Sequence, residues 1–150
     1  MRPIHWIRLV GNLANGSTLL GLILARLGRA KLSPGPEGLI LAGGYRFSFP
    51  RAGAFTVGNV ILTAHDWDDP SFRSPGLLRH EGRHSWQYFA LLGIPFLPLY
   101  VVAVAWSWLR TGDFGSANVF ERLAGLELGG YARIEPANQG LRKLLRLPPS

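Results

Sequence analysis

The sequence predicts a small α+β domain that is mainly helical, and three observations support this class. Apolar residues recur at roughly helical spacing over Ile4–Leu27. Two segments rich in Val, Ile, Phe and Tyr, Leu39–Phe49 and Ala54–Ala64, are bounded by Gly or Pro, as strands are. A helix from near Pro75 to about Leu92 follows them. A chain of 150 residues favours one domain with one core, so residues 1–150 are expected to form a single unit.

The first half of the chain is divided by residues that favour turns. Ile4–Leu27 is either one long helix or two short helices separated near Asn15 and Gly16. Ser33–Gly38 (SPGPEG) is expected to be a turn, because Pro and Gly fix the backbone and end regular structure. Pro50–Gly53 (PRAG) connects the two predicted strands, which are therefore expected to form a β-hairpin. His65–Gly76 is expected to be a loop, with Asp69 or Ser71 capping the next helix.

An uncharged segment of 21 residues, Phe89–Leu109, follows the central helix. Its length alone would allow it to cross a bilayer. Pro98 limits the continuous helix after it to about 12 residues, or roughly 18 Å, which is short of the roughly 30 Å hydrocarbon core. Two interpretations stay open: a helix that dips into or lies on a membrane, and a buried core helix. A second helix is expected at Val119–Leu128, ended by Gly129-Gly130.

The charge and the missing cysteines narrow the function classes. The net charge is +7, from 16 Lys+Arg against 9 Asp+Glu, and there is no Cys. The basic residues are scattered beside apolar segments without a stacking-aromatic motif between them, so no nucleic-acid partner is expected. Basic residues that flank apolar helices fit an anionic membrane surface. We therefore expect membrane association, with a cytoplasmic location as the alternative. Any metal site must use His and carboxylates.

The segment His80-Glu81-Gly82-Arg83-His84 fits the pattern H-E-x-x-H. Two histidines four residues apart on a helix point to one side and can share one ion. A glutamate beside the first histidine reaches a zinc-bound water instead of the metal. Zinc lowers the pKa of that water toward about 7, and the carboxylate then takes its proton. The pattern predicts His80 and His84 as zinc ligands and Glu81 as general base; a polar helix surface is the alternative.

A catalytic zinc ion needs a third protein ligand, which must come from elsewhere in the chain. We favour Glu121, because it lies 37 residues after His84 and is followed by Ala124 and Gly125, whose small size allows close helix approach. Asn118 and Glu121 also resemble a capping box, in which Glu121 would only close the start of its helix. Glu127 is the second choice. The remaining candidates are Asp113, Glu135, His5 and His65.

The H-E-x-x-H helix, a strand before it and a downstream helix with a glutamate resemble the zincin metallopeptidases over Phe55–Tyr131. A glutamate as third ligand resembles the gluzincin branch. The resemblance implies zinc on His80, His84 and Glu121, with Glu81 as general base and later acid. It also implies a peptide or protein substrate bound along the preceding strand. The residues of that strand are Thr56, Val57, Gly58 and Asn59.

Four further residues are candidates for supporting roles. Gln87 and Tyr88 follow His84 by three and four residues and could orient an imidazole or a carboxylate. Tyr88 or Tyr131 could stabilise an oxyanion, and Asn118 lies beside the third-ligand helix. The predicted function is a zinc-dependent metallopeptidase or peptidase-like hydrolase. The alternative is a non-catalytic, membrane-associated structural or binding protein with a structural or vestigial metal site.

Overall fold

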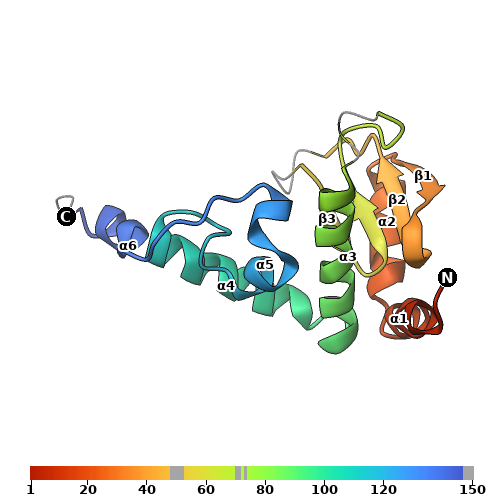
Figure 1. The fold of residues 1–150 in the computed structure, drawn as a ribbon, viewed down its shortest axis with the longest axis horizontal. Helices are drawn as coiled ribbons and strands as arrows, with labels where there is room; N and C mark the ends of the chain where they lie inside the picture. Colours follow the sequence, from red (N-terminus) through yellow and green to blue (C-terminus); the bar gives the residue numbers. More distant parts are fainter. Residues whose placement is uncertain (48–52, 70–71, 73, 147–150) are drawn as a thin grey trace. The chain divides into compact units, whose positions relative to one another are not determined.

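The computed structural model describes residues 1–47, 53–69, 72 and 74–146. The described residues form helices and one four-stranded sheet, which confirms the predicted α+β, mainly helical class. The chain divides into two compact units, Met1–Phe96 and Leu97–Ser150 (Figure 1). The first unit contains the whole sheet and the H-E-x-x-H helix, and the second contains the Glu121 helix.

The sheet of the first unit has the strand order β1-β2-β4-β3. β1 (Lys31–Pro34) pairs antiparallel with β2 (Ile40–Gly43) around the 3-10 helix η1 (Pro36–Gly38). β2 pairs in parallel with β4 (Val60–Leu62). β3 (Phe55–Val57) pairs antiparallel with β4 and forms the edge of the sheet. The sheet is therefore mixed, with two short hairpins joined by one parallel pairing.

The strand pairing corrects the sequence prediction in two places. The predicted hairpin between Leu39–Phe49 and Ala54–Ala64 is wrong, because β2 and β4 run parallel. The segment Ala54–Ala64 is itself a hairpin, with Gly58 and Asn59 as a two-residue loop between paired Val57 and Val60. Gly58 has a φ of +63°, the left-handed conformation that such loops require at their first position. Residues 50–52 of the predicted connector lie outside the described part of the chain.

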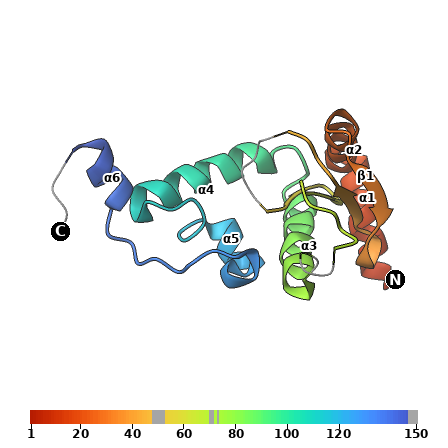
Figure 2. The ribbon, with the colours of Figure 1, turned by 90° about the horizontal axis from the view of Figure 1, so that it is seen from above.

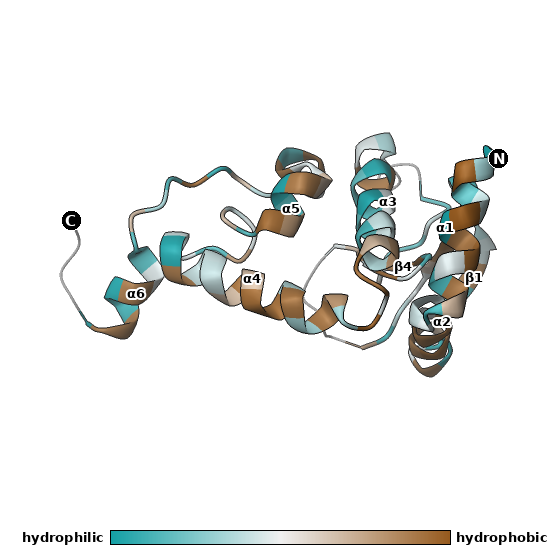
Figure 3. Ribbon diagram, turned by 90° about the horizontal axis from the view of Figure 1, so that it is seen from below, coloured by the Kyte–Doolittle hydropathy of each residue, from teal (hydrophilic) through white to brown (hydrophobic). Residues whose placement is uncertain are grey.

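The central strand β4 is buried on both faces, because a helix covers each one. Val60 faces α2 (Ser17–Leu27): a Cβ added at Gly21 would lie 2.9 Å from the Val60 Cβ. Ile61 points the other way and belongs to a core cluster packed against Leu77 and Leu78 of α3 (Pro75–Ala90). Figures 2 and 3 show α3 on one side of the strands and α2 on the other.

The N-terminal segment is two helices, as one of the two sequence interpretations proposed. α1 (Pro3–Ala14) ends before Gly16, which takes a φ of +79° at the start of α2. A buried polar network connects α1 to the rest of the unit. Asn12 donates to the Ser85 carbonyl at 2.9 Å, and the Ser85 hydroxyl donates to Asn59 Oδ1 at 2.8 Å. Asn59 Nδ2 in turn donates to Thr18 Oγ1 at 2.9 Å.

The second unit consists of helices and loops. α4 (Phe96–Thr111) begins at the end of the first unit and covers most of the predicted uncharged segment. The predicted helix Val119–Leu128 divides at Gly125, whose φ is +92°, into α5 (Val119–Ala124) and the 3-10 helix η2 (Leu126–Gly129). α6 (Gln139–Leu144) was not predicted. Among the described helices, none is long and apolar enough alone to cross a membrane, but α1 and α2 together meet that test, bent by 73°.

Candidate metal centre

α3 holds the H-E-x-x-H residues on a helix with a well-defined start. Pro75 occupies the first turn, where its missing N–H removes no helix hydrogen bond. Ser74 is the N-cap, and its hydroxyl accepts from the Leu77 N–H at 3.0 Å. The predicted capping by Asp69 is therefore wrong, and Ser71 lies outside the described residues. Downstream of this start, α3 buries polar side chains: His80, Glu81, His84 and Ser85.

The two histidines direct the same ring nitrogen toward each other. Their Nε2 atoms lie 3.1 Å apart, with the rings edge to face at a centroid distance of 4.7 Å. The His84 Nδ1 atom lies 2.8 Å from Gln87 Oε1, one turn along the helix. An amide oxygen only accepts, so the tautomer of His84 that satisfies this contact carries its proton on Nδ1 and leaves the lone pair of Nε2 for a metal. Gln87 therefore fixes the tautomer that a histidine needs to bind a metal through Nε2.

Glu81 is held against the edge strand of the sheet. Thr56 and Ile61 are register partners, so the Thr56 side chain points to the same face of the sheet as Ile61, toward α3. The Thr56 hydroxyl lies 2.7 Å from Glu81 Oε2 and 3.2 Å from the Glu81 carbonyl oxygen. Glu81 is only 3% exposed. Strand β3 therefore supplies one hydrogen-bond donor to the candidate base, a contact that the sequence alone did not indicate.

Within the second unit, Glu121 is buried at the third position of α5 and is not part of a capping box. Asn118 is the N-cap, and its Oδ1 accepts from the Phe120 N–H at 3.0 Å. The Asn118 N–H, which Glu121 would accept from in a capping box, donates instead to Gly115. Glu121 Oε1 accepts a hydrogen bond from the Tyr100 hydroxyl of α4. Tyr100 was not among the predicted site residues.

A buried group of three side chains among the described residues could hold a metal ion: His80, His84 and Glu121. These are the three residues that the sequence predicted as ligands. The other carboxylates and histidines that were considered lie elsewhere. Glu127 and Glu135 are exposed, and Asp113 accepts hydrogen bonds from Gly115 and Ser116. His5 lies 3.5 Å from Glu37, and the ring of His65 stacks on Phe72.

The remaining predicted residues are mostly packed into their own units. Tyr88 is 1% exposed and packs edge to face on Phe96, and burial raises the pKa of its hydroxyl. The ring of Tyr131 lies against Gly115 in the second unit. Val57 and Asn59 are buried, and a Cβ at Gly58 would lie 2.3 Å from the backbone nitrogen of Thr18. Substrate binding along Thr56–Asn59 stays a prediction.

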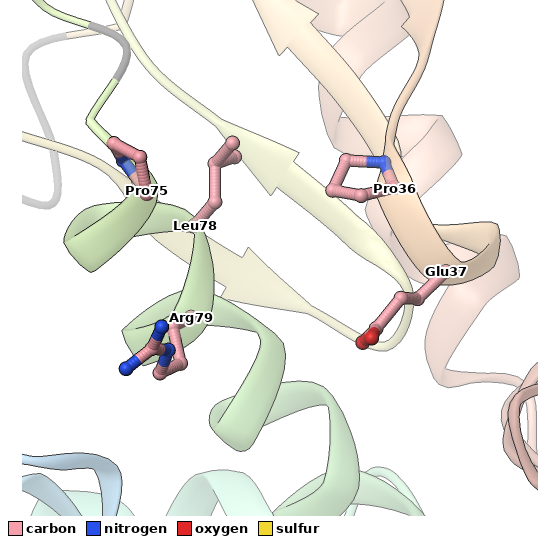
Figure 4. Close-up of a pocket in the computed structure, with 5 residues that line it drawn as sticks. All are labelled: Pro36, Glu37, Pro75, Leu78 and Arg79. Carbon is pink, nitrogen blue, oxygen red and sulfur yellow. The ribbon is translucent and has the colours of Figure 1, made fainter.

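A shallow hollow lies near the first turns of α3. Pro36 and Glu37 of η1 line one side, and Pro75, Leu78 and Arg79 of α3 line the other, as Figure 4 shows. Arg79 directly precedes His80 in the chain, but the metal-ligating side chains do not line this hollow. The hollow therefore adds no ligand to the candidate centre.

No protein-family model, curated protein or solved structure matches this chain. The arguments for its function therefore come from its own residues.

Proposed function

We propose that the chain is a zinc-dependent metallopeptidase or peptidase-like hydrolase of the zincin type. In this proposal His80, His84 and Glu121 hold the zinc ion, and Glu81 is the general base. The observation that carries the proposal is the buried His-His-Glu group beside a glutamate in the H-E-x-x-H pattern. The chemical class rests on that residue pattern, and the substrate would be a peptide or protein.

The spacing of the two imidazoles is compatible with one shared metal ion, zinc in this proposal. Two nitrogens bound to one zinc ion at 2.0–2.1 Å in tetrahedral geometry lie about 3.3 Å apart. The Nε2 atoms of His80 and His84 lie 3.1 Å apart and so fit this arrangement with little movement. Two imidazoles and one carboxylate are also the ligand set of the His₂Glu catalytic zinc sites. The chain has no cysteine that could replace one of these ligands.

The ligands are oriented by neighbours that lie within the same unit as each ligand. Gln87 accepts from His84 Nδ1, and Tyr100 donates to Glu121 Oε1. Such contacts fix the direction of each ligand atom, and their loss typically lowers metal affinity by about 10- to 100-fold. Gln87 was predicted in this role, whereas Tyr100 extends the prediction.

The proposed mechanism assigns each side chain a task. Held by His80, His84 and Glu121, a zinc ion would supply two effects: it would lower the pKa of a bound water toward about 7, and it would polarise a carbonyl. Glu81 accepts the proton of the attacking water and later delivers it to the leaving amine. The Thr56 hydroxyl holds the Glu81 carboxylate at one oxygen, Oε2, so that the carboxylate keeps one orientation relative to α3.

The same contact favours a second candidate, a non-catalytic protein with a structural metal site. In this candidate the Glu81 carboxylate has a structural role alone: its hydrogen bond with Thr56 joins α3 to the sheet. In that case His80, His84 and Glu121 would stabilise the fold through a metal without turnover. Catalysis and stabilisation differ in what they require of Glu81, and this difference can be tested.

The test compares wild type with Glu81→Gln for zinc content and for cleavage of a panel of unstructured peptides. The amide keeps the size of the side chain and an oxygen that accepts from Thr56, but it cannot take a proton. We expect equal zinc content and a loss of cleavage of about 10²- to 10⁴-fold. Zinc in both proteins without cleavage by either would favour the structural candidate. His84→Ala is the control that should lose the metal.

A further inference from the structure

The polarity of α1 is inverted relative to a helix of a water-soluble domain. Its buried face is polar: Arg8 and Asn12 are fully buried and His5 is 8% exposed. Arg8 donates to the Glu37 carbonyl at 2.7 Å, and its guanidinium lies 5.4 Å from the Trp86 ring centre. The exposed face is apolar instead. Its large side chains are 47–59% exposed: Ile4, Trp6, Ile7, Val10 and Leu13.

α2 continues the same arrangement. It packs on the sheet with small residues that allow close approach: Ser17, Thr18, Gly21 and Ala25 are all buried. Its exposed side holds Leu19, Ile23 and Leu27 at 47–61% exposure. A soluble amphipathic helix buries its apolar stripe and exposes charge. Together the exposed large residues of the two helices form what we call the apolar face: Ile4, Trp6, Ile7, Val10, Leu13, Leu19, Ile23 and Leu27.

Along the chain, the charges within and next to α1 and α2 are basic, and two acidic side chains lie near them in space: Glu37 is 3.5 Å from His5, and Asp68 is 3.6 Å from Lys31. From residue 3 to residue 25 the sole charged side chain is Arg8, which is fully buried. At the two ends of this stretch lie exposed basic residues: Arg2, Arg26, Arg29 and Lys31. The first acidic residue of the chain is Glu37. A protein–protein interface normally has a polar rim, whereas an uncharged apolar face with arginines at both ends complements an anionic lipid surface.

We propose that the apolar face of α1 and α2 docks into a lipid bilayer that carries anionic headgroups. The apolar side chains enter the hydrocarbon boundary, and Arg2, Arg26 and Arg29 lie at the level of the phosphates. The 73° bend between the two helices, which together have the length and hydropathy of one span, suits a segment that dips into one leaflet. This proposal is independent of the hydrolase chemistry, because none of the metal or base residues lies on α1 or α2.

Co-sedimentation of the full chain with vesicles tests the proposal. One vesicle type contains phosphatidylcholine alone, and the other contains phosphatidylcholine with phosphatidylserine. We expect binding to both, tighter to the anionic vesicles and weakened by salt. Ile7→Asn with Val10→Asn removes two residues of the apolar face and should lower affinity for both vesicle types at least tenfold. Arg26→Gln with Arg29→Gln should lower affinity for the anionic vesicles alone, by about fivefold for each arginine.

The matched control replaces two exposed leucines outside the apolar face, Leu32→Asn with Leu123→Asn, which are 50% and 67% exposed in wild type. This pair should bind vesicles as wild type does. Circular dichroism establishes that every variant is folded. Failure of the folded wild type to bind either vesicle type would overturn the proposal. So would a concentration-dependent dimer that is lost in the Ile7/Val10 variant while vesicle binding is unchanged, because the apolar face would then belong to a second copy of the chain.

Discussion

Thr56 and Glu81 form a buried hydrogen-bonded pair that joins strand β3 to helix α3. The Thr56 hydroxyl reaches both the carboxylate and the backbone carbonyl of Glu81, in a place where water has little access. Removing the donor leaves a buried carboxylate with one partner fewer. A buried acceptor that loses its partner typically costs about 1–3 kcal/mol.

We therefore expect Thr56→Val to lower the free energy of unfolding by about 1–3 kcal/mol in urea denaturation. Thr56→Ser retains the hydroxyl and serves as the matched control, with a smaller loss. If the valine variant is as stable as the serine variant, the hydrogen bond to Glu81 contributes nothing to the fold.

Asp113 is expected to make the free energy of unfolding depend on pH. Partial burial by itself would raise the pKa of the Asp113 carboxyl. The hydroxyl and N–H of Ser116 and the N–H groups of Gly115 and Phe114 outweigh burial and lower that pKa below its usual value of 3.8. Because the pKa of Asp113 is lower in the folded state than in the unfolded state, the ionised carboxyl stabilises the fold. This stabilisation is complete above the unfolded-state pKa and is lost as the pH falls through the folded-state pKa.

We predict that the free energy of unfolding of wild type falls as the pH drops below about 4, in part because Asp113 becomes protonated. Asp113→Asn should remove that part of the slope, and Ser116→Ala, which removes one donor, should give an intermediate slope. Denaturation measured between pH 3 and 6 on all three proteins tests this. Identical slopes for wild type and Asp113→Asn would contradict the account.

At the scale of elements, the turn between β3 and β4 determines where the edge strand meets α2. Gly58 has a φ of +63°, and a Cβ there would lie 2.3 Å from the Thr18 backbone nitrogen. Gly44 has a similar φ of +71°, but a Cβ there would meet nothing within 4 Å. The two glycines share a left-handed backbone conformation, which would strain an alanine at either position, and they differ in the space around them.

Gly58→Ala is therefore expected to be much more destabilising than Gly44→Ala. Gly44→Ala should lose about 1–2 kcal/mol from the left-handed conformation alone. Gly58→Ala adds a backbone clash and should lose several kcal/mol, about 3 or more. Equal losses in thermal or urea unfolding would mean that β3 and α2 are not packed as described.

The sequence predicted the elements better than their pairing. Helix periodicity and Pro75 located α3, and the break at Asn15 and Gly16 gave two helices, α1 and α2, as one of the two interpretations of Ile4–Leu27. The sheet was predicted incorrectly because Gly58-Asn59 was taken as part of one strand. A two-residue loop with Gly first, between valines, is a hairpin signal in the sequence itself. The parallel pairing of β2 with β4 has no such local signal, because it depends on contacts between segments far apart in the chain.

The sequence predicted those residues of the candidate centre that lie close together along the chain. His80, Glu81 and His84 follow from spacing within one helix, and Gln87 lies one turn after His84. Thr56 was predicted as part of a substrate-binding strand, but its contact with Glu81 was missed, and so was Tyr100. Each lies more than 20 residues from the glutamate it contacts, and a hydroxyl has no spacing pattern. The inverted polarity of α1 was missed for a similar reason: periodicity shows that a helix has two faces, and packing decides which one is buried.

The proposed zinc ion would take two ligands, His80 and His84, from α3 and a third, Glu121, from α5. A metal that binds the folded chain and not the unfolded chain stabilises the fold by mass action, by about 2.7 kcal/mol at a hundredfold excess over its dissociation constant. In this proposal zinc, His80, His84 and Glu121 form one site.

Zinc content of the purified proteins tests this claim most directly. Wild type, His84→Ala, Glu121→Ala and Glu127→Ala are measured by elemental analysis after the same dialysis. We expect about one zinc ion per chain in wild type and in the Glu127→Ala control. His84→Ala and Glu121→Ala should retain little or none. Near-zero zinc in wild type, or zinc unchanged by the loss of Glu121, would contradict the three-ligand site.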